Sequence, residues 1–229
     1  MSKYLLISGG TKGLGRAISN RFAREDYWVT ALYHADERAA AALRSDRIDC
    51  VCCDIARAPF ALPSLARDDE LMIIHNAAYG FTPQPMHLSD WAHYRNHWEV
   101  AVGGAHHLIY PNLRQMLQLS RSTVIAVLSS VVAGMPPKGF AAYASAKLAL
   151  KGFMESFAVE FSGRGIRCLC VSPGFMDTAL TQGWDARFRQ AAGADFAPST
   201  EQVADEIFHL AHASTMDAAG ENHLLGVRT

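Results

Sequence analysis

Residues 3–15 are Lys-Tyr-Leu-Leu-Ile-Ser-Gly-Gly-Thr-Lys-Gly-Leu-Gly, and this stretch decides the fold class. The apolar run Lys3–Ser8 predicts a buried strand, and the glycines after it predict a tight loop at Gly9–Gly13. A helix is expected over Leu14–Glu25 because apolar residues recur there at helical spacing. Its apolar face consists of Leu14, Ile18 and Phe22. A strand, a glycine-rich turn and a helix in succession favour a phosphate site at the N-terminus of that helix.

The rest of the chain repeats this alternation of apolar strands and amphipathic helices. Further strands are expected at Trp28–Tyr33, Asp49–Cys53, Leu71–His75, Thr123–Leu128, Arg167–Ser172 and His223–Leu225. Helices are expected at Asp36–Ser45, Ser89–Leu119, Ala142–Ser162 and from a capping box at Ser199–Gln202 to about Ala211. Pro111 is expected to bend or divide the second of these helices. Such alternation predicts an α/β fold: one domain over residues 1–229, with helices on both faces of a doubly wound, mostly parallel seven-stranded sheet.

Composition narrows the functional classes. The 229 residues include 21 Lys or Arg and 22 Asp or Glu, for a net charge of −1 at pH 7. This balance argues against nucleic acid and membrane surfaces as partners, and no apolar run is long enough to predict a membrane span. The five cysteines form no CxxC pair and the ten histidines show no ligand spacing. We therefore expect a cytoplasmic protein with no metal site.

Ligands of doubly wound sheets bind beyond the carboxyl ends of the strands, and one such end carries acid–base chemistry. Ser130 follows the strand Thr123–Leu128, and Tyr143 and Lys147 lie one helical turn apart on the next helix. A phenol is a poor acid–base group at neutral pH because its pKa is about 10, and an ammonium nearby lowers that pKa. Tyr143 is then able to protonate a carbonyl oxygen that Ser130 orients.

These residues together resemble the short-chain dehydrogenases/reductases over nearly the whole chain, from Lys3 to about Gly226. The family's glycine motif matches Ser8-Gly9 through Gly13-Leu14-Gly15, and its NNAG motif matches His75-Asn76-Ala77-Ala78. Its active-site serine matches Ser130, thirteen residues before the YxxxK tyrosine Tyr143. Its PGxxxT motif matches Pro173 through Thr178. The resemblance implies a Rossmann fold that binds a nicotinamide dinucleotide.

By that resemblance Ser130, Tyr143 and Lys147 are the catalytic residues, and Lys147 also binds the nicotinamide ribose. Asp54, after the third strand, matches the residue near the adenine, and Thr178 the residue beside the carboxamide. The full set expected to bind the cofactor is Gly9, Thr11, Lys12, Gly13, Leu14, His34, Asp54, Ile55, Asn76, Ala77, Tyr143, Lys147, Pro173, Gly174 and Thr178.

One departure from the family pattern concerns catalysis. Relatives carry an Asn on the long helix before the serine, where it supports a proton relay to the lysine. Here Ala101 or Val102 takes that place, and the nearest Asn is Asn96, about two turns upstream. The side chains of Ala101 and Val102 cannot form hydrogen bonds. Besides a fully active enzyme, this leaves open a cofactor-binding protein with weak or no catalysis.

The cofactor is expected to be NADP(H) rather than NAD(H). The second strand ends at Tyr33-His34 and carries no acid to bind the ribose hydroxyls of NAD. Asp36 and Glu37 follow, as the expected beginning of a helix. Lys12 precedes Gly13, where NADP-preferring relatives often carry a basic residue, and His34 offers a second donor.

Substrate predictions come from the segment after the PGxxxT motif and from one longer stretch of sequence. A lid is expected over about residues 179–197, with Leu180, Trp184, Phe188 and Phe196 as an apolar wall. Phe81, Met86, Met135 and Phe140 are candidates for the rest of the wall. The segment Ala149–Gly174 is most similar to the 3-oxoacyl-ACP reductase branch, so a 3-oxoacyl thioester linked to ACP or CoA is the first substrate hypothesis. A small cyclic or aromatic alcohol or ketone is the alternative.

Partners follow from the same resemblance. An acidic carrier protein would need a basic surface, for which Arg121, Arg164 and Arg167 are candidates. Family members are usually homodimers or homotetramers that associate through the helices expected at Ser89–Leu119 and Ala142–Ser162, where Gly103 and Gly104 would permit a close approach.

Overall fold

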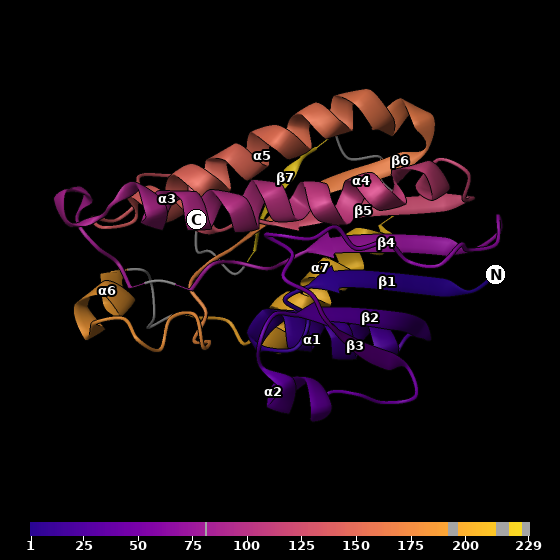
Figure 1. The fold of residues 1–229 in the computed structure, drawn as a ribbon, viewed down its shortest axis with the longest axis horizontal. Helices are drawn as coiled ribbons and strands as arrows, with labels where there is room; N and C mark the ends of the chain where they lie inside the picture. The colour runs from indigo at the N-terminus through magenta and orange to yellow at the C-terminus, as the bar shows by residue number, and fades with distance from the viewer. Residues whose placement is uncertain (81, 192–196, 214–219, 226–229) are drawn as a thin grey trace.

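The computed structural model describes residues 1–80, 82–191, 197–213 and 220–225. Its seven strands form a single parallel sheet in the order β3-β2-β1-β4-β5-β6-β7 (Figure 1). The strands are β1 (Lys3–Ser8), β2 (Tyr27–Tyr33), β3 (Ile48–Cys52), β4 (Glu70–His75), β5 (Arg121–Val127), β6 (Ile166–Pro173) and β7 (Asn222–Leu225). The predicted doubly wound Rossmann fold is confirmed, and the sheet is parallel throughout.

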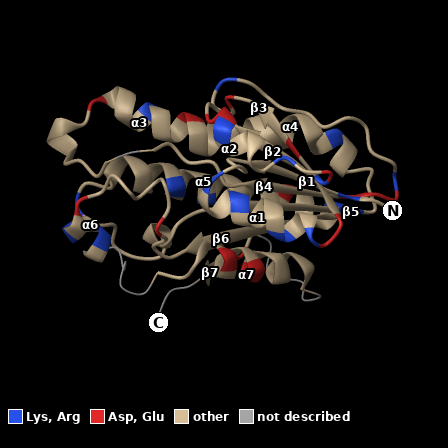
Figure 2. Cartoon of the chain, turned by 90° about the horizontal axis from the view of Figure 1, so that it is seen from below, with Lys and Arg blue, Asp and Glu red and all other residues tan. Residues whose placement is uncertain are grey.

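Helices cover both faces of this sheet (Figures 1 and 2). They are α1 (Gly13–Ala23), α2 (Glu37–Ala41), α3 (Trp91–Trp98), α4 (Gly104–Met116), α5 (Ala141–Phe161), α6 (Ala186–Ala191) and α7 (Thr200–His212), with a π-helical turn η2 (Glu99–Gly103) between α3 and α4. Three short 3₁₀ turns are η1 (Met86–Leu88), η3 (Ser130–Val132) and η4 (Ser162–Arg164). Lys and Arg positions and Asp and Glu positions are scattered along these elements (Figure 2).

Side chains of β1 alternate between two apolar cores because successive residues of a strand point to opposite faces. Leu5 and Ile7 pack with the predicted apolar face of α1, all three members of which are buried, and with α7. Leu6 packs on the other face with residues of α4 and α5 such as Leu108 and Leu150. Each strand is therefore covered on both sides, which explains why the strands are continuous apolar runs.

The expected long helix Ser89–Leu119 is divided, but not at proline. Pro111 lies within α4 and cannot donate a hydrogen bond to the carbonyl of His107. That carbonyl accepts from the backbone N–H of Phe60 instead, at 3.1 Å. The irregular part is the π turn η2, eight residues earlier, which contains the position of the missing Asn.

Two helix beginnings are as predicted. Asp36 caps α2 by accepting from the backbone N–H of Ala39 at 3.0 Å. Ser199 and Gln202 form the capping box of α7. Within the described residues, no helix is long and apolar enough to cross a membrane.

Candidate active site

A cavity of about 940 Å³ lies at the carboxyl ends of the central strands. The loops after β1, β2, β4, β5 and β6 all contribute to its wall. Every residue that the sequence analysis assigned to catalysis or cofactor binding lines it, from Gly9 to Thr178. Parallel strands explain this convergence, because their carboxyl ends meet at one edge of the sheet.

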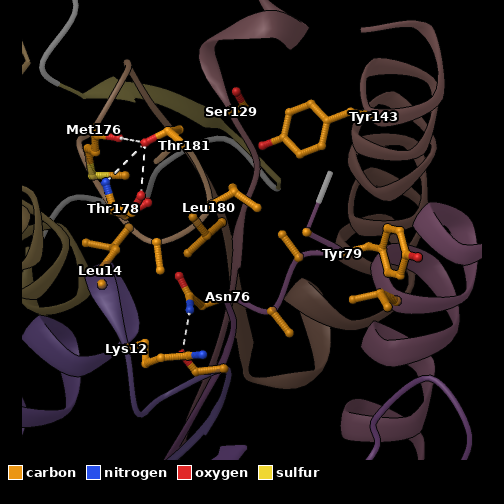
Figure 3. Close-up of a pocket in the computed structure, with 18 of the residues that line it drawn as sticks. Lys12, Leu14, Asn76, Tyr79, Ser129, Tyr143, Met176, Thr178, Leu180 and Thr181 are labelled. Carbon is orange, nitrogen blue, oxygen red and sulfur yellow. Dashed lines mark hydrogen bonds between the residues drawn. The ribbon is translucent and has the colours of Figure 1, made fainter. Parts of the chain in front are cut away.

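The glycine loop between β1 and α1 has the geometry of an anion site. Gly9 and Gly13 have φ of +63° and +49°, values that residues with a side chain rarely adopt. A Cβ on Gly15 would lie 2.0 Å from the carbonyl oxygen of Gly9, so the loop and helix touch here. Asn76 braces the loop by donating to that oxygen at 3.0 Å (Figure 3).

The N-cap residue of α1, Lys12, forms no side-chain capping hydrogen bond, so no side chain competes with a ligand for the first backbone N–H groups of this helix. The helix dipole adds attraction for a negative group at the same place. A dinucleotide pyrophosphate fits this cradle. When bound, a reduced nicotinamide dinucleotide supplies a hydride.

Two basic residues, Lys12 and His34, lie at the end of the cavity built by β1, β2 and β3. Lys12 forms an ion pair with Asp36 at 3.1 Å, and the His34 ring lies 3.7 Å from a carboxylate oxygen of Asp54. The backbone N–H of Ala39 and the Lys12 ammonium together hold the pKa of Asp36 below its usual value. Asp36 is thus a helix cap held by a lysine, rather than an acid at the end of β2.

Tyr143 and Lys147 lie one turn apart on α5, as predicted, and both are buried. The Lys147 Nζ donates to the carbonyl oxygen of Val127 at 2.7 Å and lies 5.9 Å from the centre of the Tyr143 ring. Burial lowers the pKa of Lys147 to about 8. This strand-end hydrogen bond fixes the ammonium beneath the tyrosine.

The expected lowering of the Tyr143 pKa is wrong for the protein without ligand. Burial raises the pKa of Tyr143, and a hydrogen bond with Ser129 opposes the rise without cancelling it. Burial removes water from the phenolate and so disfavours it, because the tyrosine is only 8% exposed. The phenol therefore holds its proton at neutral pH, as a general acid must.

The serine that faces Tyr143 is Ser129 (Figure 3). Ser130, the residue chosen by spacing, begins η3 and lines the same cavity. Sequence reasoning did not single out Ser129, although the pair Ser129-Ser130 was visible at the end of the strand. Adjacent positions differ in direction there because the chain passes from a strand into a 3₁₀ turn.

The position of the missing Asn is occupied by apolar residues. Ala101 is buried within the π turn η2, and Val102 is half-buried. Asn96 does not replace the amide, because it donates to the Tyr79 hydroxyl at 3.2 Å. One turn before Ala101, the buried His97 ring packs edge-on against Tyr143 with centres 5.9 Å apart.

The substrate side of the cavity is apolar and aromatic. Phe140, Tyr143, Phe175 and Trp184 form a buried cluster, with Phe188 packed against it. Leu180 and Met135 also line the cavity, whereas Met86 is 73% exposed and does not. Phe81 and Phe196, which were also expected in the wall, lie outside the described residues, as does the segment 192–196 of the expected lid.

The suggested carrier-docking surface is on the wrong side of the sheet. Arg121 begins β5 and pairs with Glu70 at 3.8 Å. Arg164 and Arg167 flank the beginning of β6. All three lie at the amino ends of parallel strands, the edge opposite the cavity.

Among the described residues, no group of three or more His, Cys, Asp or Glu is placed to hold a metal ion.

Comparison with known proteins agrees with this geometry. A family model described as short chain dehydrogenase matches residues 3–188. The chain is 31% identical to 2,3-dihydro-2,3-dihydroxybenzoate dehydrogenase of Escherichia coli, over 78% of this chain and 71% of the relative. It is 24% identical to the 3-oxoacyl-[acyl-carrier-protein] reductase of Chlamydia muridarum, over 80% and 77%. The crystal structure of 3-ketoacyl-(acyl-carrier-protein) reductase from Brucella melitensis with NADH superposes with a TM-score of 0.82 at 19% identity, covering 97% of this chain and 96% of that one.

Proposed function

Because the chain belongs to the short-chain dehydrogenase family and is an oxidoreductase that uses a nicotinamide cofactor, we propose that it is an NADPH-dependent carbonyl reductase. The proposed substrate is an uncharged ketone, and in particular a 3-oxoacyl thioester on ACP or CoA. One observation carries this proposal: Tyr143 is a buried, protonated phenol at the cavity wall, with Lys147 below it and serines beside it.

Each of these groups has a separate role in ketone reduction. Tyr143 donates its proton to the carbonyl oxygen as negative charge develops there. Ser130 orients that oxygen, while Ser129 holds the phenol through its hydrogen bond. Lys147, fixed by Val127, supplies positive charge under the phenol and contacts the nicotinamide ribose. The glycines of the β1–α1 loop would hold the pyrophosphate of the cofactor, and Thr178, which lies next to Gly13, would lie beside the nicotinamide carboxamide.

The charge distribution of the cavity supports an uncharged substrate. Its described acidic and basic side chains are Lys12, His34, Asp36 and Asp54 at the glycine-loop end, and Lys147 near Tyr143. The opposite part is lined by Tyr79, Met135, Phe140, Leu180 and Trp184. Such a wall suits an acyl chain and offers no described partner to a carboxylate or sulfonate.

The likeness to 3-oxoacyl reductases and the open, apolar wall together support the thioester hypothesis. A carrier would approach the cavity rim, where Lys138 and Arg187 are exposed close in sequence to the lining residues Pro137 and Trp184.

We further propose a cytoplasmic homodimer or homotetramer. Large apolar side chains on α3 and α5 are exposed, among them Trp98, Leu148 and Val159.

A second candidate function is reduction or oxidation of a small cyclic or aromatic compound. It is favoured by the aromatic cluster around Trp184 and by the relative that acts on a dihydroxybenzoate derivative. An aromatic ring would stack on these side chains in preferred edge or offset geometry.

The deciding experiment is NADPH oxidation against a panel of carbonyl compounds that includes an acetoacetyl thioester, a cyclic ketone and an aromatic ketone. We expect the highest kcat/KM with the thioester. Preference for a cyclic or aromatic ketone would instead support the second function. Tight binding of NADPH with no turnover of any ketone would overturn the reductase proposal and favour a cofactor-binding protein.

Cofactor preference has its own test in Lys12→Glu. Reversal of this charge places a carboxylate where the extra phosphate of NADPH would lie, so the KM for NADPH should rise roughly 10- to 100-fold while that for NADH changes little. Steady-state kinetics with both cofactors measures this. Lys3→Glu is the matched control, because Lys3 lies at the amino end of β1, away from the cavity. An equal rise in the KM for both cofactors would refute the proposed preference for NADP(H).

A further inference from the structure

His75, at the carboxyl end of β4, is completely buried and has a defined hydrogen-bond partner. Its Nδ1 lies 2.9 Å from the Ser8 Oγ. That oxygen already accepts from the backbone N–H groups of Asn76 and Ala77, each at 3.1 Å. A hydroxyl oxygen accepts two hydrogen bonds, so the Ser8 proton is left to be donated to Nδ1. His75 is therefore the neutral tautomer with its proton on Nε2.

The imidazole ring lies beside the π turn η2 and the beginning of α4. The backbone of Val100 and Ala101 lies close enough to favour a proton on the ring. Within the described part of the chain, Nε2 is buried without a hydrogen bond of standard geometry. A Cβ on Gly104 would lie 3.0 Å from the ring's Cε1, so only glycine leaves the ring room there. A π turn shifts the helical hydrogen-bond pattern, and its carbonyls need donors from elsewhere.

The same ring adjoins the catalytic lysine. Burial lowers the pKa of His75 to about 3, and the charge of Lys147 contributes to this shift. The ring is thus neutral at working pH and adds no competing charge beside the ammonium. Val100, on the turn it faces, lines the cavity.

We propose that His75 is a positioning residue for the acid–base pair, in that its ring ties β1, through Ser8, to the π turn at Val100 and Ala101. The turn has Ala101 at the position where relatives carry an Asn, so it has no amide side chain of its own there to bind its backbone. In this proposal the Nε2–H group of His75, on β4, faces the backbone of the turn as a donor, although its contact there lacks the geometry of a standard hydrogen bond. Because His97 precedes the turn and packs against Tyr143, a turn that relaxed to regular α-helix would rotate His97 and displace the phenol. The inference rests on the proposed reductase function.

Two substitutions separate the contacts of the ring. His75→Asn keeps an acceptor for Ser8 but is too short to reach the turn, whereas His75→Gln keeps a donor at the reach of Nε2. We expect His75→Asn to lower kcat about 10- to 100-fold with little change in the KM for NADPH, and to shift the alkaline limb of the kcat–pH profile. We expect His75→Gln to retain most of the activity. Equal losses in both variants, or none in His75→Asn, would overturn the proposal.

Recovery of kcat by a second substitution provides a further check on the role of His75. Introducing Ala101→Asn into the His75→Asn protein places an amide inside the turn and should restore kcat at least partly. No gain in the double variant, at unchanged thermal midpoint, would contradict the positioning role.

A measurement without substrate keeps this proposal separate from the proposed function. Nitrogen NMR of ¹⁵N-histidine-labelled protein, with His75→Gln to assign the signal, should show an Nε2–H tautomer that remains neutral at about pH 5. An Nδ1–H tautomer, or titration near the ordinary histidine pKa, would refute the hydrogen-bond assignment even if the enzyme reduces no ketone. Failure of the carbonyl panel alone would refute only the proposed function.

Discussion

Replacing Tyr143 by Phe is expected to lower kcat for ketone reduction by about 10³-fold while leaving NADPH binding nearly unchanged. The phenol is the general acid of the proposed reaction, and its pKa is raised by burial, so it holds the proton that the carbonyl oxygen must receive. Phenylalanine preserves the ring that packs against Phe140 and His97, so the fold should be retained.

The measurement is single-turnover and steady-state reduction of the best ketone of the panel, with NADPH affinity followed by fluorescence titration. Tyr79→Phe is the matched control, because it removes a hydroxyl that also lies at the cavity wall but pairs with Asn96. Near-wild-type turnover by the Tyr143→Phe protein would show that another group donates the proton.

Substitution of the two neighbouring serines should separate two roles. Ser130→Ala is expected to lower kcat by about 10²- to 10³-fold, because it removes the donor that orients the carbonyl oxygen. Ser129→Ala is expected to cost less, but to raise the Tyr143 pKa further, because the hydrogen bond that lowers it is lost. Each variant removes one serine hydroxyl, at neighbouring positions of the chain, so each is the control for the other.

The pH profile decides between the serines. Loss of Ser129 should move the limb assigned to Tyr143 to higher pH, whereas loss of Ser130 should lower the rate at all pH values without moving that limb. A larger loss of kcat from Ser129→Ala than from Ser130→Ala would show that the serine facing Tyr143 also orients the substrate, and that spacing along the chain selected the wrong residue.

Local sequence was sufficient for much of the fold and for the location of the site. A buried parallel strand needs a continuous apolar run, and a tight turn before a helix needs glycine at Gly9 and Gly13, so both are legible from residue types alone. Tyr143 and Lys147 are four residues apart in one helix, where the backbone itself sets their relation. The doubly wound, mostly parallel sheet and the edge of it that binds ligand followed from these local patterns.

Features that depend on contacts between distant segments required the tertiary structure. The direction of the Tyr143 pKa shift depends on how completely other elements exclude water from α5. The arginines considered for carrier docking lie at the strand ends opposite the cavity, which only the strand order and directions reveal. The π turn is followed by Gly104, which meets the His75 ring of β4, and that ring is in turn held by the Ser8 hydroxyl of β1. Residue identities determined the chemistry available to this protein, whereas packing decided which groups carry protons and which side chains face one another.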